Sequence, residues 1–108
     1  MRERDVESYL TKKLNGIGLS CLKFIPDDRT GMPDRVILLP GGRVLWCELK
    51  TKGGSLSEIQ KYRHLELSKS GHEVVTVWDI PQADALVERL RDEVCSSHAL
   101  SASAYEPT

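Results

Sequence analysis

Two acidic residues and a lysine stand in a pattern that could place them around one metal ion. Asp34 follows Gly-Met-Pro, and Glu48 and Lys50 lie further along in the triplet Glu-Leu-Lys. Carboxylates are ligands that Mg²⁺ prefers, and a bound divalent ion lowers the pKa of its water and neutralises charge on a phosphate. An ammonium beside such an ion orients the attacking water or stabilises the phosphate in the transition state. The residue types therefore suit phosphodiester hydrolysis.

A β-hairpin is needed to bring Asp34 and Glu48 together. The apolar runs 36–39 and 44–46 are separated by Pro-Gly-Gly, which is typical of strands joined by a tight turn. With a three-residue loop, Asp34 falls opposite Glu48 on the neighbouring strand. Period-2 alternation then places Lys50 on the same face as Glu48.

Other pairings of the hairpin remain open. A loop of two or four residues, or a β-bulge, would move Asp34 and Glu48 to opposite faces. The charges could also simply cover the end of an ordinary hairpin. If the three-residue loop forms, the two carboxylates repel each other unless a cation lies between them, and a divalent metal ion is the obvious candidate.

Two further residues could support this site. Glu7 borders the apolar stripe of a predicted N-terminal helix, where it would add a ligand, hold a water or pair with a nearby Lys or Arg. Gln60 lies one turn into a helix after the glycine pair 53–54, where its amide would position a water or a phosphate, or face solvent. The backbone carbonyl of Leu49, between Glu48 and Lys50, would complete the ligand set.

The predicted elements alternate in a way that indicates an α/β fold. Strand–helix–strand after residue 44 implies a parallel strand pair, so we expect a mixed central sheet flanked by helices in the order α-β-β-β-α-β-α. We expect one domain over residues 1–95 and a flexible tail over 96–108. The expected elements are a helix over 4–15, a strand over 19–25, the hairpin over 34–50, a helix capped by Ser55 and Glu58 with Leu56, Ile59, Leu65 and Leu67 toward the core, a strand over 73–78 and a last helix from Pro81 carrying Leu86, Leu90 and Val94.

Composition narrows the class of protein. No apolar run is long enough to span a bilayer, and no secretory signal precedes the charged first residues. The cysteines at 21, 47 and 95 form no Cys-x-x-Cys pair, which fits a reducing cytoplasm, with the first two in the core. Residues 1–72 carry 13 Lys and Arg against 9 Asp and Glu, and residues 73–108 carry 2 against 7. The excess of positive charge over residues 1–72 weakly favours a polyanionic partner.

These residues together resemble the VRR-NUC branch of the PD-(D/E)xK nucleases, which have a restriction-endonuclease-like fold. The resemblance covers residues 3 to 80 and is strongest at Gly-x-Pro-Asp-Arg over 31–35, Glu48-Leu49-Lys50, the Gly-Gly-Ser-Leu-Ser run and Gln60. It implies DNA cleavage with Mg²⁺ or Mn²⁺ and no organic cofactor. It also implies that Asp34, Glu48 and the Leu49 carbonyl bind metal, that Lys50 is catalytic, and that Glu7 and Gln60 support them.

The small stand-alone members of this branch, from bacteria and phages, suggest a homodimer acting on branched DNA such as four-way junctions. We expect a cytoplasmic location, in a bacterium or a phage-infected cell. The alternatives are a non-catalytic DNA-binding protein on the same fold and a sequence-specific restriction subunit; cysteine chemistry with His64 or His72 has no supporting spacing. The candidate DNA contacts are Lys52, which is the best placed, and Lys23, Arg29, Arg35, Lys61 and Arg63.

Overall fold

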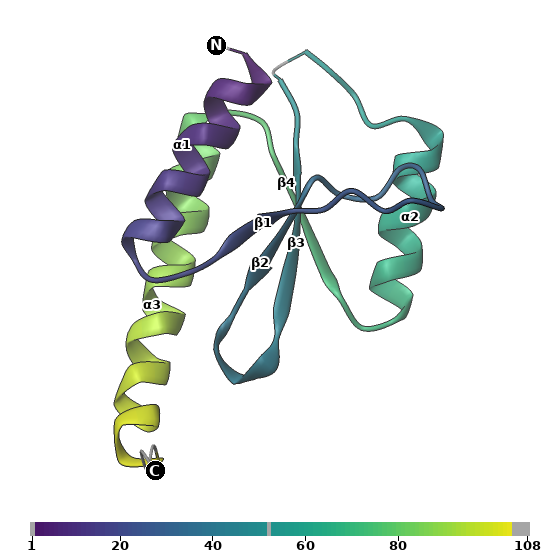
Figure 1. The fold of residues 1–108 in the computed structure, drawn as a ribbon. Coiled ribbons are helices and arrows are strands. Elements are labelled where there is room, and N and C mark those ends of the chain that lie inside the picture. The colour runs from purple at the N-terminus through teal and green to yellow at the C-terminus, as the bar shows by residue number, and fades with distance from the viewer. Residues whose placement is uncertain (1, 52, 105–108) are drawn as a thin grey trace.

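The expected order of elements is confirmed in the computed structural model, which describes residues 2–51 and 53–104 (Figure 1). A single 3₁₀ turn is added in the hairpin loop. The elements are α1 (Glu3–Gly16), β1 (Cys21–Lys23), β2 (Arg35–Leu38), η1 (Pro40–Gly42), β3 (Val44–Leu49), α2 (Glu58–Lys69), β4 (Glu73–Val77) and α3 (Ile80–Ala104).

The four strands form one mixed sheet in the order β1-β2-β3-β4. The first three strands are antiparallel neighbours, and β3 pairs with β4 in parallel, as the helical connection between them predicts. The hairpin register is also confirmed, because Arg35 pairs with Cys47 and Leu38 with Val44. This register puts Asp34, which immediately precedes β2, at the position opposite Glu48.

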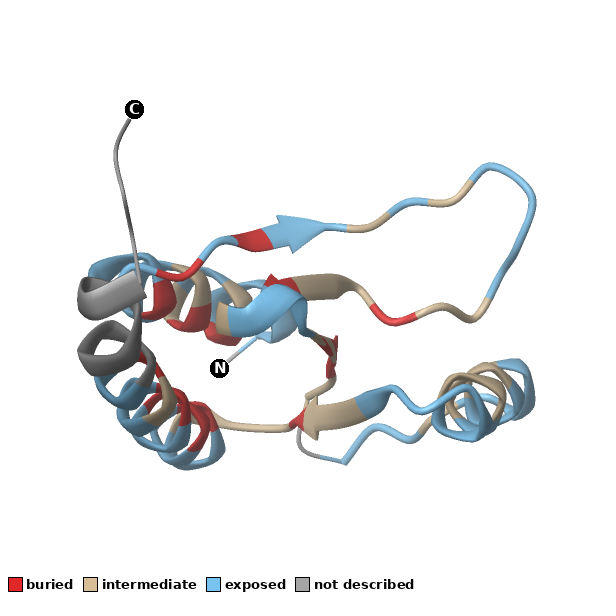
Figure 2. Ribbon diagram, turned by 90° about the horizontal axis from the view of Figure 1, so that it is seen from below, coloured by how far each residue is buried: buried red, intermediate tan, exposed pale blue. Residues whose placement is uncertain are grey.

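The hydrophobic core lies between the sheet and the pair α1 and α3. Helix α1 buries Val6, Leu10 and Leu14, which recur at helical spacing, while α3 buries Leu90 among others. Odd-numbered sheet residues meet these helices; the buried ones in the strands are Cys21, Ile37, Leu45, Cys47, Leu49 and Val77. Buried residues gather on the facing sides of α1, α3 and the sheet in Figure 2. One face of the sheet is therefore filled by apolar packing.

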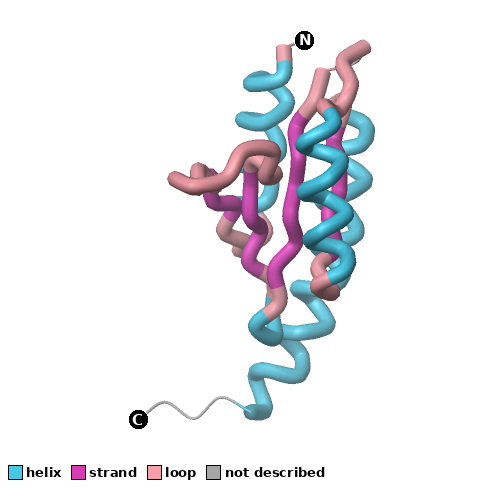
Figure 3. The backbone as a smooth tube through the Cα atoms, turned by 90° about the vertical axis from the view of Figure 1, so that its right-hand side faces the viewer, coloured by secondary structure: helices cyan, strands magenta, loops and turns pink. Residues whose placement is uncertain are grey.

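The opposite face of the sheet is covered more thinly, by α2. This helix lies in front of the strands in Figure 3, apart from α1 and α3. None of its residues, all of which the structure describes, is buried, so the expected core stripe is wrong: Ile59 and Leu65 are exposed. The reason is that α2 packs against β4 and the 26–33 loop at the edge of the molecule rather than over the centre of the sheet.

The ends of α2 are fixed by local hydrogen bonds. Ser57, not Ser55, is the N-cap, and its hydroxyl accepts from the Gln60 N–H while the Gln60 Oε1 accepts from the Ser57 N–H at 2.8 Å. At the other end Gly71 has a φ of +89°, and the next N–H donates to the Leu67 carbonyl at 3.0 Å. Gly71 thus ends the helix in the left-handed conformation that its position predicts.

The last helix begins at Ile80 and runs to Ala104, past the predicted boundary at residue 95. Leu86, Leu90 and Val94 are buried as expected. The division into a domain and a tail stays a prediction. Within residues 2–51 and 53–104, no helix is both long and apolar enough to cross a membrane. Cys21 and Cys47 are buried and Cys95 is exposed, as expected.

Candidate active site

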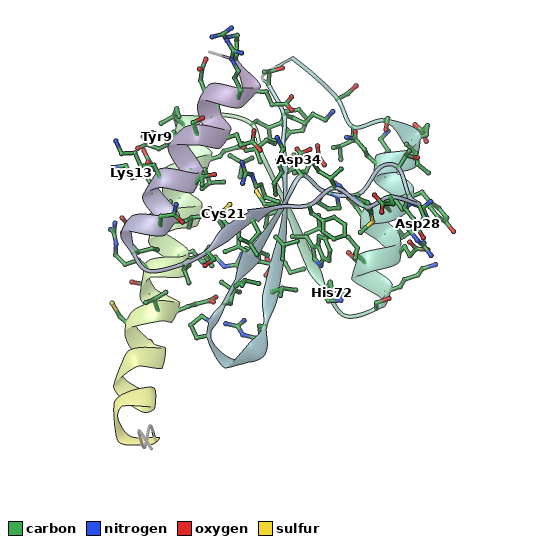
Figure 4. All side chains as sticks on the ribbon, in the orientation of Figure 1. Tyr9, Lys13, Cys21, Asp28, Asp34 and His72 are labelled. Carbon is green, nitrogen blue, oxygen red and sulfur yellow. The ribbon has the colours of Figure 1, made fainter. Side chains whose placement is uncertain are left out.

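Asp34 is held at the start of β2 by backbone contacts on both sides. Its carbonyl accepts the Phe24 N–H at 2.9 Å, and its Oδ2 accepts the Leu49 N–H at 3.0 Å. Figure 4 shows Asp34 in the upper part of the view, well away from His72, which precedes β4. Because one carboxylate oxygen is tied to β3, the Asp34 side chain is directed toward the Glu48 strand.

Glu48 is the one charged residue among the described side chains that is buried, with 2% of its surface exposed. Burial, chiefly, and the adjacent Asp34 carboxylate raise its pKa to about 8, while the Lys50 ammonium opposes that rise. Two carboxyl groups in hydrogen-bonding range cannot both be charged cheaply without a cation between them. The position between Asp34 and Glu48 is therefore one where a cation would be stabilised.

Helix α2 presents two side chains to the Glu48 carboxylate. The Gln60 Nε2 donates to the Glu48 Oε2 at 3.3 Å, so the amide that caps the helix also fixes one side of the carboxylate. The His64 Nε2 lies 3.9 Å from the Glu48 Oε1, and this imidazole is 14% exposed. Burial lowers the pKa of His64, which favours its neutral form.

The two facing atoms of Glu48 and His64 are both left unsatisfied. Within the described residues, the Glu48 Oε1 and the His64 Nε2 are buried and have no hydrogen-bond partner. A buried unpaired polar atom is costly, so an ion or water is expected there. The described residues contain no cluster of three or more His, Cys, Asp or Glu side chains suited to hold an ion alone. Asp34 and Glu48 fit Mg²⁺ or Mn²⁺, ions that take one or two carboxylates and complete their coordination with waters and carbonyls.

Glu7 lies on the other side of the sheet from this pair. Its Oε2 accepts from the Arg35 Nε at 2.8 Å, and Arg35 also donates to the Cys21 carbonyl. Arg35 alternates away from Asp34, so the ion pair links α1 to the core-facing side of β2. The alternative that Glu7 pairs with a nearby cation is therefore what the structure contains, and a role toward metal stays a prediction.

Glu3 is the acidic residue of α1 whose charge reaches the site, and sequence reasoning missed it. Its carboxylate contributes to the raised pKa of Glu48. The signal available in the sequence was its position one turn before Glu7 at the start of the same helix. Lys50 follows β3 directly, with its N–H donating to the Val77 carbonyl at 3.0 Å, so β4 fixes the backbone of this lysine.

The candidate DNA-binding cations differ in how far their charges are engaged. Arg63 is 17% exposed and donates to the Thr30 carbonyl at 3.0 Å, which ties α2 to the 26–33 loop. Arg29 pairs with Glu66 and Lys61 with Glu58 on the exposed surface of α2. Lys23 is exposed on β1. Lys52 lies outside the described residues, and a DNA contact by any of these side chains stays a prediction.

Two known proteins are similar to this chain, one found by sequence and one by structure. The chain is 32% identical over 77 residues to "Putative nuclease p44" of Acyrthosiphon pisum secondary endosymbiont phage 1, covering 71% of this chain and 83% of that protein. A solved structure described as "VRR_NUC domain" superposes with a TM-score of 0.74 and 28% identity, over 80% of this chain and 94% of the other. The chain belongs to the VRR-NUC nuclease family. No family model matches it.

Membership in the VRR-NUC family confirms the nuclease fold that the sequence indicated. The structure brings Asp34, Glu48 and Gln60 together at one end of the β2–β3 hairpin, with Lys50 close enough to act on the charge of Glu48. The sequence named His64 only as a candidate for cysteine chemistry and did not indicate its place beside Glu48. Its signal was the four-residue spacing from Gln60, which puts both side chains on one face of α2.

Proposed function

We propose that this VRR-NUC domain is a Mg²⁺- or Mn²⁺-dependent endonuclease that cuts branched DNA as a homodimer. The observation that carries the proposal is the unsatisfied Oε1 of the buried Glu48 beside Asp34. An acidic pair in that state is stabilised most directly by a divalent cation. A cytoplasmic location agrees with such a substrate.

The residues of the site have distinct tasks in this proposal. Asp34, Glu48 and the Leu49 carbonyl would hold the metal, which when bound supplies an activated water and neutralises charge on the scissile phosphate. Lys50 orients the attacking water and stabilises the extra negative charge of the transition state. Gln60 keeps the Glu48 carboxylate in place, because its amide is itself fixed by the Ser57 cap.

DNA would be held chiefly through its phosphates. Lys23, Arg29 and Lys61 are exposed cations on β1, the 26–33 loop and α2, and Lys52 follows the catalytic strand in the sequence. Contacts of this kind give affinity without sequence information, so selection by DNA shape fits better than selection by sequence. Arg35 and Arg63 are largely buried in their contacts with Glu7 and Thr30, which favours the exposed cations as the phosphate contacts. The ion pairs of Arg29 and Lys61 are exposed and therefore weak.

Dimerisation follows from what two-strand cleavage requires. The part of the chain that the structure describes has one buried acidic site, at Glu48. Cutting two strands of a symmetric junction needs two sites related by a two-fold axis. Large apolar side chains are exposed on and beside β1, among them Leu22 and Ile25. Exposed apolar surface of this kind marks candidate contact areas between copies.

Cleavage of a substrate panel tests the proposal. Wild type, Asp34→Asn and Lys50→Ala would be incubated with labelled four-way junction, flap, splayed and duplex DNA, with Mg²⁺, Mn²⁺ or EDTA, and the product ends mapped. Asp28→Asn is the matched control, because Asp28 is exposed in the 26–33 loop. We expect metal-dependent cutting of branched DNA by wild type and Asp28→Asn alone.

The other outcomes identify the alternatives. Binding of DNA without cutting under any metal would favour a non-catalytic DNA-binding protein. Cutting of linear duplex at fixed sequences, without preference for branches, would favour a restriction subunit. Sedimentation of the protein as a monomer, with and without DNA, would contradict the homodimer.

A further inference from the structure

His64 and Glu48 form an arrangement that the carboxylate pair does not explain. Gln60 satisfies the Glu48 Oε2, but the Oε1 faces the His64 Nε2 at 3.9 Å with no hydrogen atom shared between them. That separation is too long for a hydrogen bond. Two buried polar atoms, the His64 Nε2 on α2 and the Glu48 Oε1 on β3, therefore face each other without a hydrogen bond.

A metal ion fits this gap by distance and by charge. Divalent first-row ions and Mg²⁺ lie about 2.0–2.2 Å from nitrogen or oxygen ligands, so two ligands of one ion are separated by at most about 4.2–4.4 Å. The observed 3.9 Å is within that limit. The cation would also offset the charge of Glu48 beside Asp34, which a water molecule would not.

We propose that His64 supplies an imidazole nitrogen to the ion that Glu48 holds, and that this nitrogen makes the site prefer Mn²⁺ to Mg²⁺. The inference rests on the metal dependence proposed above and goes beyond it by naming a ligand from α2. Mg²⁺ is a hard ion that keeps oxygen ligands and waters, whereas nitrogen ligands suit first-row transition ions better. The ion then also connects α2, which packs weakly on the sheet, to strand β3.

The first test is the affinity of the protein for each ion, measured by calorimetric titration of wild type, His64→Ala and His72→Ala without DNA. Wild type should bind Mn²⁺ more tightly than Mg²⁺. Loss of a residue that only orients a metal ligand typically lowers metal affinity about 10- to 100-fold, so loss of a ligand in His64→Ala should lower the affinity for Mn²⁺ by at least about that factor. Its Mg²⁺ affinity should change little, since water replaces the imidazole. His72, exposed just after α2, is the matched control and should leave both affinities unchanged.

The second test detects a histidine nitrogen at the ion directly in wild type, and the variants then assign it. Pulsed electron paramagnetic resonance of Mn²⁺-loaded wild type should show coupling to a nitrogen nucleus, and ¹⁵N-labelling of histidine should change that coupling. The signal should persist in His72→Ala and vanish in His64→Ala. A histidine with only a structural role would not produce it.

The outcomes separate this inference from the proposed function. If Mn²⁺ binds, and binding is lost in Glu48→Gln, but no histidine nitrogen is coupled and the Mn²⁺ to Mg²⁺ preference is unchanged in His64→Ala, the role of His64 is wrong and the metal site stands. If neither ion binds to wild type, both are wrong. Circular dichroism and retained Mg²⁺ binding show that His64→Ala is folded.

Discussion

Replacing Glu48 with glutamine should stabilise the metal-free protein at neutral pH and leave its stability unchanged in acid. The folded-state pKa of Glu48, about 8, is raised from the value of 4.5 expected in the unfolded chain. A raised pKa means that the folded protein binds the proton more tightly. The stability from the protonated carboxyl is therefore complete below pH 4.5 and is lost as the pH rises toward 8.

The size of this effect follows from the shift. Each pKa unit corresponds to about 1.4 kcal/mol, so at pH 7, about 2.5 units above the unfolded-state value, wild type should have lost about 3 kcal/mol relative to Glu48→Gln. Above pH 8 the difference should level off at about 5 kcal/mol, as an order of magnitude. Glutamine matches the neutral carboxyl in shape, so the two proteins should be equally stable near pH 4.

Urea unfolding in EDTA at pH values from 4 to 8.5 measures the difference in unfolding free energy between the two proteins. Glu88→Gln is the control, because Glu88 is 66% exposed on α3 and its replacement should produce no comparable trend. Adding Mn²⁺ should reverse the order of stability at pH 7, since the ion binds the ionised carboxylate of wild type. A difference between wild type and Glu48→Gln that does not vary with pH would show that folding does not raise the pKa of Glu48.

Three further changes test how the surrounding structure positions the site. Gly31→Ala should lower the free energy of unfolding by about 2–4 kcal/mol, which is more than Gly41→Ala should lower it. Both glycines have positive φ, but only at Gly31 would an added Cβ lie 2.8 Å from the α2 backbone. Equal losses of the two variants in urea unfolding would contradict this. Glu7→Ala should lower stability by about 1–3 kcal/mol, because it leaves the half-buried Arg35 unpaired; unchanged thermal unfolding would show that the ion pair contributes nothing. Gln60→Ala should lower both helix stability, by about 1 kcal/mol, and the cleavage rate; an unchanged rate would exclude a role in holding Glu48.

The hairpin and its register could be predicted because they depend on local rules. The apolar runs fix which residues pair, and the three-residue loop Pro40–Gly42 fixes the offset, with positive φ at Gly41 and Gly42 that glycine readily adopts. Once those are known, Asp34 opposite Glu48 follows by counting. The acidic pair was therefore accessible from the sequence.

The contribution of α2 could not be predicted because it depends on tertiary packing. Both Ser55 with Glu58 and Ser57 with Gln60 match the capping pattern, and the local sequence does not separate them. The structure selects Ser57, where Gln60 both caps the helix and donates to Glu48. The same docking turns His64 inward, which helical spacing alone does not determine.

The proposed nuclease activity depends most on Asp34 and Glu48 sharing one cation. Crystals of the protein soaked in Mn²⁺ and measured for anomalous scattering would test this directly. A shared cation should give an anomalous peak between the two carboxylates that is absent from crystals of Glu48→Gln. Fully occupied Mn²⁺ elsewhere on the protein, with no peak between Asp34 and Glu48, would contradict it.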